Sequence, residues 1–396
     1  MTRGIVALNA GSSSIKFGAY RIDSDGSPVH VAGGKIEKIG LSPSLLVRTD
    51  GGDVLLERQW PDGANLEHEQ LLGEFIEWAI GHLGEHRLVA VGHRVVHGGA
   101  RFIEPMLVDD ALLGELGRLS ALAPLHQPHN LAAIRAIARI LPDIPQVACF
   151  DTAFHATRPE VATRFALPRR FHEQGIRRYG FHGLSYEYVA RHLAVIDPVL
   201  AGGRVIVAHL GNGASLCAMH CGKSVDTTMG FTALDGLMMG TRSGSLDPGV
   251  VLHLIRQMGM RAEEVEALLY HQSGLLGVSG LSSDMRTLEQ SGAPEAEDAM
   301  VLFAWRAARE AGGLVSSLGG LDGIVFTAGI GENDAAMRAR ICKGMAWAGI
   351  AIDADANAAN ADVISTPDSR VTVRVVPTDE ERMIALHTLA LLERGA

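Results

Sequence analysis

Hydrophobic and polar positions alternate along the chain with two periods, and this alternation predicts two halves built on the same plan. Short apolar runs bounded by turn residues predict strands. In the first half these strands are residues 4–9, 14–22, 87–97 and 145–151. A glycine pair inside residues 50–53 indicates a hairpin. Apolar side chains recur at helical spacing over residues 71–83 and 128–141.

The second half repeats this order. Its predicted strands are residues 204–210, 213–220, 223–229, 323–329 and 370–376. Helices are expected to begin near Pro248, Ala262 and Asp379 and after Asn333, and a long helix is expected over residues 294–318. Each half therefore reads as a β-meander followed by alternating helices and strands, which predicts an α/β fold with mixed sheets and helices packed on them.

Length and composition agree with two globular domains. The chain has 396 residues, of which 47% are hydrophobic and 20% charged. We expect one domain over residues 1–151, with a final helix at 379–396 packing back on it, and a second over residues 152–378.

Charge and hydropathy exclude some classes of protein. The net charge is −10 and Lys and Arg do not cluster, which argues against a nucleic-acid surface. No apolar run approaches the ~18 residues of a membrane span. A cytoplasmic protein without a membrane partner is expected, with its four cysteines reduced.

Three glycine-containing loops follow predicted strands and could hold phosphate groups. They are NAGSSSIK at 9–16, HLGNGAS at 209–215 and AGIGEN at 328–333. Glycine lets backbone N–H groups approach a phosphate, and serine hydroxyls and a lysine add further donors. Neither the GxxxxGK[ST] pattern nor a strand-linked GxGxxG is present, so a P-loop or dinucleotide fold is not expected.

Nine motifs occur in the order typical of acetate kinases: NAGSSSIK, GHRVVHGG, CFDTAFH, RRYGFHGLS, HLGNGAS, MGTRSG, SSDMR, FTAGIGEN and PTDEE. The chain thus resembles the acetokinase family, from Asn9 to Glu381. That family belongs to the superfamily of acetate and sugar kinases, heat-shock ATPases and actin, whose members duplicate a ribonuclease-H-like domain. The resemblance implies an active site in the interdomain cleft, ATP or ADP and acetate as substrates, Mg²⁺ that Mn²⁺ can replace, and a homodimer formed through the second, nucleotide-binding domain.

The same resemblance assigns residues to ATP and to the metal. Metal ligation falls to Asn9 and to Glu380, and Mg²⁺ usually keeps several of its waters. The ATP-binding positions are Ser12, Ser14, Lys16, His209, Leu210, Gly211, Asn212, Gly213, Asp284, Met285, Arg286, Gly329, Ile330, Gly331, Glu332 and Asn333.

Two arginines are candidates for the reacting centre, because guanidinium groups match carboxylate and phosphate oxygens. By resemblance Arg94 holds the acyl carboxylate, and Arg242 stabilises the transferring group with His182 beside it. The acyl pocket is then lined by Val96, Leu125 and Phe181.

Asp151 ends an apolar strand, where its carboxylate is expected to be exposed at the mouth of the sheet. An alcohol acceptor would need a base, but a carboxylic acid with a pKa of about 4 is already ionised at neutral pH. We therefore assign Asp151 to ordering the metal shell and the nucleophile. Glu381 stands three residues after Thr378, and this spacing is typical of a capping box, which leaves Glu380 free for the metal.

Some positions differ from the family pattern, namely Ala233, Ser245, Leu184 and Tyr186. None of these positions has a charged role, so the differences concern acyl specificity. Propionate kinase is the main alternative activity and butyrate kinase a weaker one. A nucleotide-driven switch of the actin or heat-shock type is the alternative from another class, and such a protein would not need GHRVVHGG, YGFHG and GTRSG.

Overall fold

The computed structural model describes residues 3–11, 14–66, 68–82 and 87–394. The chain divides into two compact units: Met1–Phe154 together with Asp379–Ala396 form unit 1, and His155–Thr378 form unit 2. In the described ranges no helix is long and apolar enough to cross a membrane.

Unit 1 is built on an eight-stranded sheet in the order β5-β4-β3-β2-β1-β6-β8-β7. Strands β1 to β5 form an antiparallel meander, and β6 and β8 run parallel to β1. The strands are β1 Arg3–Ala10, β2 Ile15–Ile22, β3 Pro28–Glu37, β4 Ser44–Arg48, β5 Val54–Gln59, β6 Arg87–Val95, β7 Met106–Leu107 and β8 Gln146–Phe150. The sequence did not predict β3, whose run contains two adjacent glycines.

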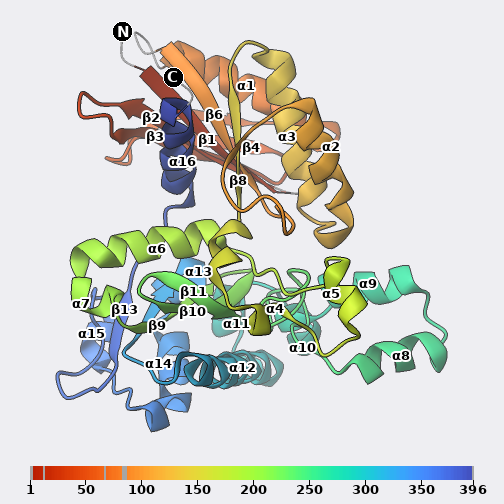
Figure 1. The fold of residues 1–396 in the computed structure, drawn as a ribbon, viewed down its shortest axis with the longest axis vertical. Helices are drawn as coiled ribbons and strands as arrows, with labels where there is room; N and C mark the ends of the chain where they lie inside the picture. Colours follow the sequence, from red (N-terminus) through yellow and green to blue (C-terminus); the bar gives the residue numbers. More distant parts are fainter. Residues whose placement is uncertain (1–2, 12–13, 67, 83–86, 395–396) are drawn as a thin grey trace. The chain divides into compact units, whose positions relative to one another are not determined.

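Helices cover both faces of this sheet (Figure 1). On one face α1 packs against α3, and Phe75 of α1 stacks on Phe17 of β2 with ring centroids 3.6 Å apart. On the other face α16 lies close to β6, because a Cβ on Gly92 would come within 2.2 Å of Thr388 Oγ1. The helices are α1 His68–His82, α2 Asp110–Arg118, α3 Gln127–Ile140 and α16 Glu380–Arg394, with 3₁₀ turns η1 Gly63–Asn65 and η2 Ser120–Leu122. A further 3₁₀ turn, η3 Ala153–Thr157, begins in unit 1 and ends in unit 2.

Unit 2 repeats the central part of this plan with a five-stranded sheet in the order β11-β10-β9-β12-β13. Here too the first three strands are antiparallel and the last two run parallel to the first, as in β3-β2-β1-β6-β8. The strands are β9 Arg204–Leu210, β10 Ala214–His220, β11 Lys223–Thr227, β12 Gly323–Thr327 and β13 Thr372–Val375. The predicted mixed α/β fold with a duplicated plan is confirmed.

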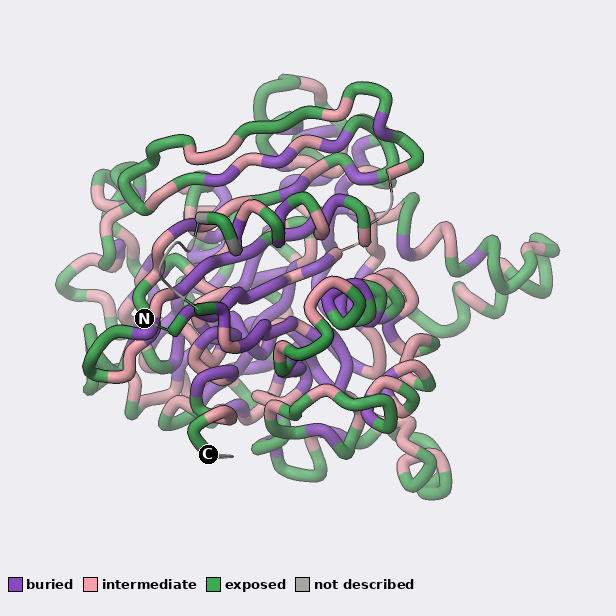
Figure 2. The backbone as a smooth tube through the Cα atoms, turned by 90° about the horizontal axis from the view of Figure 1, so that it is seen from above, coloured by how far each residue is buried: buried purple, intermediate pink, exposed green. Residues whose placement is uncertain are grey.

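The long predicted helix of unit 2 is α12, which packs on β9, β10 and β11. It has Pro294 at its first position and ends at Gly319, whose φ of 70° a glycine adopts without strain. Most strand residues of the two sheets are buried (Figure 2). The helices are α4 Glu160–Thr163, α5 Arg169–Glu173, α6 Gly183–Ile196, α7 Pro198–Ala201, α8 Pro248–Arg256, α9 Ala262–His271, α10 Gly274–Ser279, α11 Met285–Ser291, α12 Pro294–Leu318, α13 Ala328–Asn333, α14 Ala335–Gly344 and α15 Ala354–Ala358, with η4 Ala346–Ala348.

One predicted loop is instead a helix. The AGIGEN segment forms α13, a single short helix directly after β12. Its first residue, Ala328, has a φ of 66°, and its backbone N–H donates to the Glu332 carboxylate at 2.7 Å. This bond to a side chain satisfies one of the backbone amides that a helix leaves unpaired at its start. The sequence pattern did not predict a helix here.

Candidate active site

In unit 1, four of the predicted residues form one hydrogen-bonded network. Because β1, β6 and β8 are parallel neighbours, their carboxyl ends meet at one edge of the sheet and bring Asn9, Arg94 and Asp151 together. Arg94 donates from Nε and Nη2 to Asp151 Oδ2, at 2.8 and 2.6 Å, and from Nη1 to Asn9 Oδ1 at 3.0 Å. Asn9 Nδ2 donates to Glu380 Oε2 at 3.0 Å, which joins the start of α16 to the strand ends.

The charges of this network are held largely out of solvent. The Arg94 side chain is 15% exposed and that of Asp151 is 0% exposed. Burial alone would lower the pKa of Arg94, but the carboxylates of Asp151 and Glu380 outweigh it and raise that pKa above its usual range. The expectation that Asp151 lies exposed at the mouth of the sheet is therefore wrong, because the Arg94 guanidinium pairs with its carboxylate and lets it be buried.

Val96 and Leu125, two residues predicted for the acyl pocket, also belong to unit 1. Val96, which follows β6, is 2% exposed. Its backbone N–H donates to Asn130 Oδ1 at 3.0 Å, and Asn130 Nδ2 donates to the Ala10 carbonyl at 2.6 Å. The buried Asn130 on α3 thus ties the Val96 segment to the end of β1, a link that the sequence analysis missed. Leu125 is half-buried just before α3.

The first glycine loop lies between β1 and β2. The Gly11 amide donates to the Ser14 carbonyl at 2.7 Å, which closes a tight turn. Ser12, predicted to bind ATP, lies outside the described residues. Lys16 is exposed on β2 and lines a cavity of about 630 Å³ on the face of the meander.

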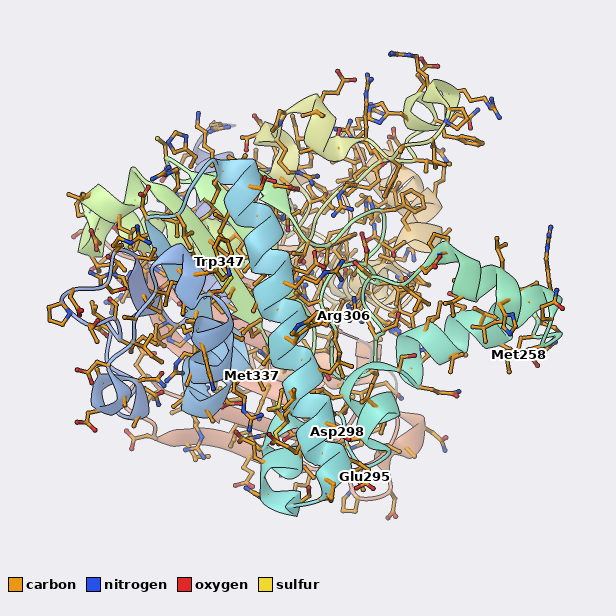
Figure 3. All side chains as sticks on the ribbon, turned by 90° about the horizontal axis from the view of Figure 1, so that it is seen from below. Met258, Glu295, Asp298, Arg306, Met337 and Trp347 are labelled. Atoms are coloured by element: carbon orange, nitrogen blue, oxygen red, sulfur yellow. The ribbon has the colours of Figure 1, made fainter. Side chains whose placement is uncertain are left out.

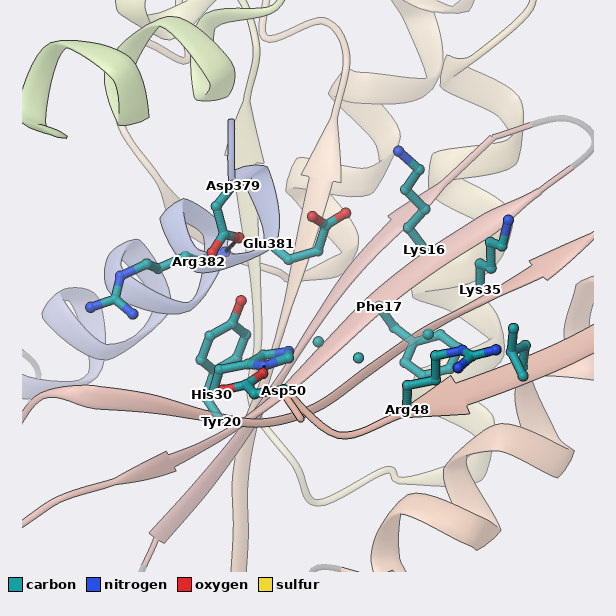
Figure 4. A pocket seen from close by; sticks show the side chains of 14 residues that line it. Lys16, Phe17, Tyr20, His30, Lys35, Arg48, Asp50, Asp379, Glu381 and Arg382 are labelled. Atoms are coloured by element: carbon teal, nitrogen blue, oxygen red, sulfur yellow. Dashed lines mark hydrogen bonds and ion pairs between the residues drawn. The ribbon is translucent and has the colours of Figure 1, made fainter. Parts of the chain in front are cut away.

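This cavity collects charges of both signs (Figure 4). Asp379, Glu381 and Arg382 come from the start of α16, the strands supply Lys16, Tyr20, His30, Lys35 and Arg48, and the turn after β4 supplies Asp50. Burial raises the pKa of the Glu381 carboxyl, the neighbouring Glu380 raises it further, and Lys16 opposes both. The cavity does not include Arg94 or Asp151 among its lining residues.

The predicted capping box at the start of α16 is wrong. Asp379 performs the capping, since its Oδ1 accepts a hydrogen bond of 2.8 Å from the Arg382 amide. Thr378 is engaged elsewhere, because its hydroxyl donates to Ser185 Oγ at 2.9 Å. Glu381 is therefore free of a capping role and turns toward the cavity (Figure 4).

The unit 1 network offers only oxygen donors for a metal. The carboxylates of Asp151 and Glu380 and the amide oxygen of Asn9 are hard ligands of the kind that Mg²⁺ or Mn²⁺ prefers. The described residues contain no group of three or more His, Cys, Asp or Glu side chains arranged to hold a metal. So few protein ligands suit Mg²⁺, because this ion usually keeps several of its waters and is also bound by substrate phosphates.

In unit 2, His182 occupies the position before α6 in a left-handed conformation, with φ 58° and ψ 25°. A non-glycine residue seldom adopts this conformation, and such strain is common at functional sites. Its ring stacks on that of His209 with centroids 4.1 Å apart. Its Nδ1 lies 2.9 Å from the Ser215 hydroxyl.

Arg242 lies close to His182, at the second glycine loop. A Cβ on Gly213 would lie 3.4 Å from His182 Nε2 and 3.8 Å from Arg242 Nη2, so both groups reach one point of this turn. The Arg242 guanidinium is oriented by the Ala233 carbonyl, which accepts from its Nη1 at 2.9 Å. The GTRSG segment rests on the turn, since the Gly240 amide donates to the Asn212 carbonyl at 3.0 Å. The turn, His182 and Arg242 therefore make one compact cluster.

The remaining predicted ATP residues of unit 2 lie on two short helices. Asp284 caps α11 through the Thr287 amide and pairs with Arg286 at 2.8 Å, and this pairing lowers the pKa of Asp284. Met285 is buried. On α13, Gly329 and Asn333 are exposed and Gly331 is buried. The Glu332 carboxylate accepts hydrogen bonds from the backbone amides of Ala328 and Thr378, so it holds the local backbone in place.

Two residues near His182, Ser215 and Tyr186, have contacts that the sequence did not predict. Ser215 follows the second glycine turn, and nothing in its local sequence pairs it with a histidine 33 residues earlier. Tyr186 stood out only as a departure from the family pattern, yet its hydroxyl lies 2.5 Å from Ser215 Oγ. Phe181, predicted for the acyl pocket, is buried, and its carbonyl is bonded to His155 Nε2 at 2.9 Å.

Comparison with known proteins decides the family. The model of the acetokinase family matches residues 4–386. This chain belongs to the acetokinase family. An acetate kinase of Rhodopseudomonas palustris is 52% identical over 399 residues, and the match covers 100% of both chains.

Two solved structures are also similar to this chain. A propionate kinase from Francisella tularensis superposes with a TM-score of 0.89 at 36% identity, covering 97% of this chain and 98% of its own. The acetate kinase of Porphyromonas gingivalis gives a TM-score of 0.83 at 39% identity, covering 98% of this chain and 100% of its own. As an acetokinase, the chain is an ATP-using phosphotransferase with a carboxyl group as acceptor. The alternative of a nucleotide-driven switch without an acyl substrate is set aside.

Proposed function

We propose that this acetokinase transfers the γ-phosphoryl group of ATP to acetate, reversibly and with Mg²⁺, to give acetyl phosphate and ADP. The observation that carries the proposal is Arg94, a guanidinium held in place by a buried carboxylate near the end of a strand, with the apolar Val96 two residues later. A fixed positive charge beside an apolar surface suits a short carboxylate. The name of the Rhodopseudomonas palustris relative supports acetate as that carboxylate.

Arg94 binds the acetate carboxylate, and Asp151 fixes Arg94. Both Nε and Nη2 of Arg94 donate to Asp151 Oδ2, which sets the plane of the guanidinium before substrate arrives. Acetate is ionised at neutral pH and brings no proton that must be removed. Asp151 therefore acts by orienting the arginine and by ordering the metal shell, and a general base is not required.

Asn9, Glu380 and Asp151 would hold Mg²⁺, directly or through its waters. When bound, the ion neutralises charge on the phosphate oxygens. The protein presents its oxygen donors to the ion at fixed positions. The hydrogen bond between Asn9 and Glu380 keeps two of these residues together. We favour direct in-line transfer, because a phosphorylated glutamate would add a second displacement that the reaction does not need.

Unit 2 supplies donors to the transferring group. Arg242 and His182 converge on Gly213, where they would stabilise negative charge on the equatorial oxygens. We assign residues 209–213, 284–286 and 329–333 to ATP, with Ser12, Ser14 and Lys16 from the first loop. Within the third segment, Glu332 would act by shaping the backbone, since its carboxylate is occupied by two amides.

A substrate panel tests this proposal. ATP is supplied with acetate, propionate or butyrate, and ADP and acyl phosphate are both measured. We expect equal amounts of ADP and acetyl phosphate, the highest kcat/KM with acetate, and a measurable, inferior activity with propionate, since one methylene is worth about 10- to 200-fold. ADP release without acyl phosphate would contradict a carboxyl acceptor.

Propionate kinase remains the second candidate. The Francisella tularensis structure carries that name and superposes with the TM-score of 0.89. A wild-type kcat/KM that is higher for propionate than for acetate would favour it. We place the protein in the cytoplasm in either case, because ATP is its co-substrate.

We further propose a homodimer formed through α12 of unit 2. The exposed side of this helix carries Glu295 and Asp298 near its start, Val301 and Trp305 in the middle, and Arg309 after them. Figure 3 shows the acidic start of the helix, where Glu295 and Asp298 are labelled. Val301 is 49% and Trp305 57% exposed. If two copies of α12 cross antiparallel on a two-fold axis, the basic end of each faces the acidic end of the other, and the apolar centres meet.

A charge swap tests this surface. Arg309→Glu should shift the molar mass measured by light scattering from dimer toward monomer, and so should Asp298→Arg. The double variant restores complementary charges across the axis and should restore the dimer. A double variant that is no more dimeric than either single variant, or a wild-type monomer, would contradict the proposal.

A further inference from the structure

A chain of hydroxyl groups leads to the inner nitrogen of His182. His182 Nδ1 lies 2.9 Å from Ser215 Oγ, and Ser215 Oγ lies 2.5 Å from the Tyr186 hydroxyl. Ser215 and Tyr186 are both 0% exposed. The chain of three side chains is therefore closed to bulk water along its inner part.

Local structure explains why these side chains meet. Tyr186 stands one helical turn after His182, and its amide donates to the His182 carbonyl at 3.1 Å, the first bond of α6. Ser215 lies on β10 directly opposite His209 on β9. The His209 ring in turn stacks on that of His182, at an angle of 18°. The ring of His182 is thus fixed on one face by His209 and at Nδ1 by Ser215.

The outer nitrogen of the same ring faces the glycine turn. His182 Nε2 would lie 3.4 Å from a Cβ on Gly213, next to Arg242 Nη2. A group that stabilises a phosphoryl group at this point must donate a hydrogen bond, because the oxygens of that group are acceptors. The imidazole can do so only if its proton is on Nε2.

We propose that Tyr186 and Ser215 are positioning residues that set the tautomer of neutral His182. The Tyr186 hydroxyl donates to Ser215 Oγ, the Ser215 hydroxyl donates to the lone pair of His182 Nδ1, and the ring proton stays on Nε2. The opposite order would place the proton on Nδ1 and turn a lone pair toward the phosphoryl oxygens. The proposal rests on the role given to His182 above; no covalent bond is made or broken in this chain of hydroxyls.

The tautomer can be measured without any turnover. In ¹⁵N-labelled wild-type protein, two-bond ¹H–¹⁵N spectra distinguish the two nitrogens of each ring, and the His182→Gln variant identifies the signals of His182 among the 17 histidines. We expect a protonated Nε2 and an unprotonated Nδ1. Tyr186→Phe should weaken this preference, and Ser215→Ala should abolish it. A neutral His182 with its proton on Nδ1 in the wild-type protein would overturn the proposal, whatever the enzyme's substrate proves to be.

Kinetics then test whether the tautomer matters for transfer. Ser215→Ala and Tyr186→Phe should lower kcat, by roughly tenfold for the serine and less for the tyrosine, with little change in the KM for acetate. Tyr186→His keeps a donor at this position and should recover part of the loss seen in Tyr186→Phe. In a His182→Ala background neither substitution should lower kcat further, because both act through the imidazole.

A matched control separates positioning from packing. Ser224 is also a buried serine bonded to a histidine, His155, at 2.9 Å, and it lies on the neighbouring strand β11. Ser224→Ala should lower the Tm about as much as Ser215→Ala and leave kcat within about twofold of wild type. An equal loss of kcat in both serine variants, or a further loss from Ser215→Ala when His182 is already absent, would assign Ser215 a structural role and overturn the proposal.

Discussion

The two units share one strand plan but hold their functional groups by different means. In unit 1, Arg94 is fixed by the buried carboxylate of Asp151 and by Asn9, at the carboxyl ends of the parallel strands. In unit 2, His182 is fixed by a serine hydroxyl and by a stacked imidazole, and the site gathers at the turn between β9 and β10. The same strand plan therefore supports a paired arginine in one unit and a histidine, a serine and an arginine grouped at a glycine turn in the other.

This difference fits the two parts of the proposed reaction. The acceptor is a small anion that must be held in the ground state, which a fixed, paired guanidinium can do. The transferring group gains its special charge distribution only in the transition state, where pre-oriented donors are most effective. Substitutions in unit 1 should accordingly act mainly on KM, and those in unit 2 mainly on kcat.

Arg94→Ala should have the largest effect. It removes the proposed acetate anchor and also leaves the buried Asp151 carboxylate without its guanidinium. We expect kcat/KM for acetate to fall roughly 10³-fold, mostly through KM, and unfolding stability to drop by about 3–5 kcal/mol. Steady-state kinetics and thermal unfolding measure both. Arg101→Ala is the control, because Arg101 is 73% exposed and its pair with Glu115 lies at the surface.

Arg242→Ala should follow, with the opposite kinetic profile. Its guanidinium is proposed to act in the transition state, so kcat should fall by roughly 10²-fold with little change in the KM for acetate. The exposed Arg261 of the same unit provides the matched alanine control. Identical changes in kcat and KM for Arg94→Ala and Arg242→Ala would remove the distinction between the two units.

Asp151→Asn should have an intermediate effect that separates orientation from base catalysis. The amide oxygen can still accept from Arg94, but the negative charge is lost. The Mg²⁺ concentration for half-maximal activity should rise by roughly tenfold. Single-turnover rates of the wild-type enzyme should be the same in light and heavy water, because acetate is already ionised. A large solvent isotope effect would instead assign proton transfer to this step.

Val96→Ala should have the smallest effect and should change selectivity. If Val96 lines the acyl pocket as proposed, shortening its side chain makes room for one more methylene, and the ratio of kcat/KM for acetate over propionate should narrow or invert. Val91→Ala is the control, since Val91 is a fully buried β6 residue of the same unit. Both variants should lose about 1–3 kcal/mol of stability. If the ratio of the two acids stays unchanged in Val96→Ala, then Val96 is a core residue only.

The sequence predicted the elements better than the contacts between them. The starts of α8, α9 and α12 follow from proline and alanine positions, and glycine ends α12, because capping is a local property. The third strand was missed because its glycines and polar residues weaken the strand pattern. Its pairing with β2 and β4 is a tertiary effect that no local pattern contains.

The candidate site shows the same limit. The motifs identified Arg94 and Asp151, but their pairing joins positions 57 residues apart, and the burial of the carboxylate depends on it. Ser215 and His182 are likewise distant in the chain and meet only because β10 and α6 are neighbours in space. At α16, both Thr378 and Asp379 are residue types that cap helices, but Asp379 accepts from the Arg382 amide and Thr378 bonds to the distant Ser185.

The stereochemical course at phosphorus tests the central claim most directly. ATP made chiral at the γ-phosphorus with three oxygen isotopes is converted with acetate, and the configuration of the transferred phosphoryl group in acetyl phosphate is determined. Direct in-line transfer from ATP to the carboxylate predicts inversion. Retention would require two displacements through a phosphorylated residue and would contradict the account of both units.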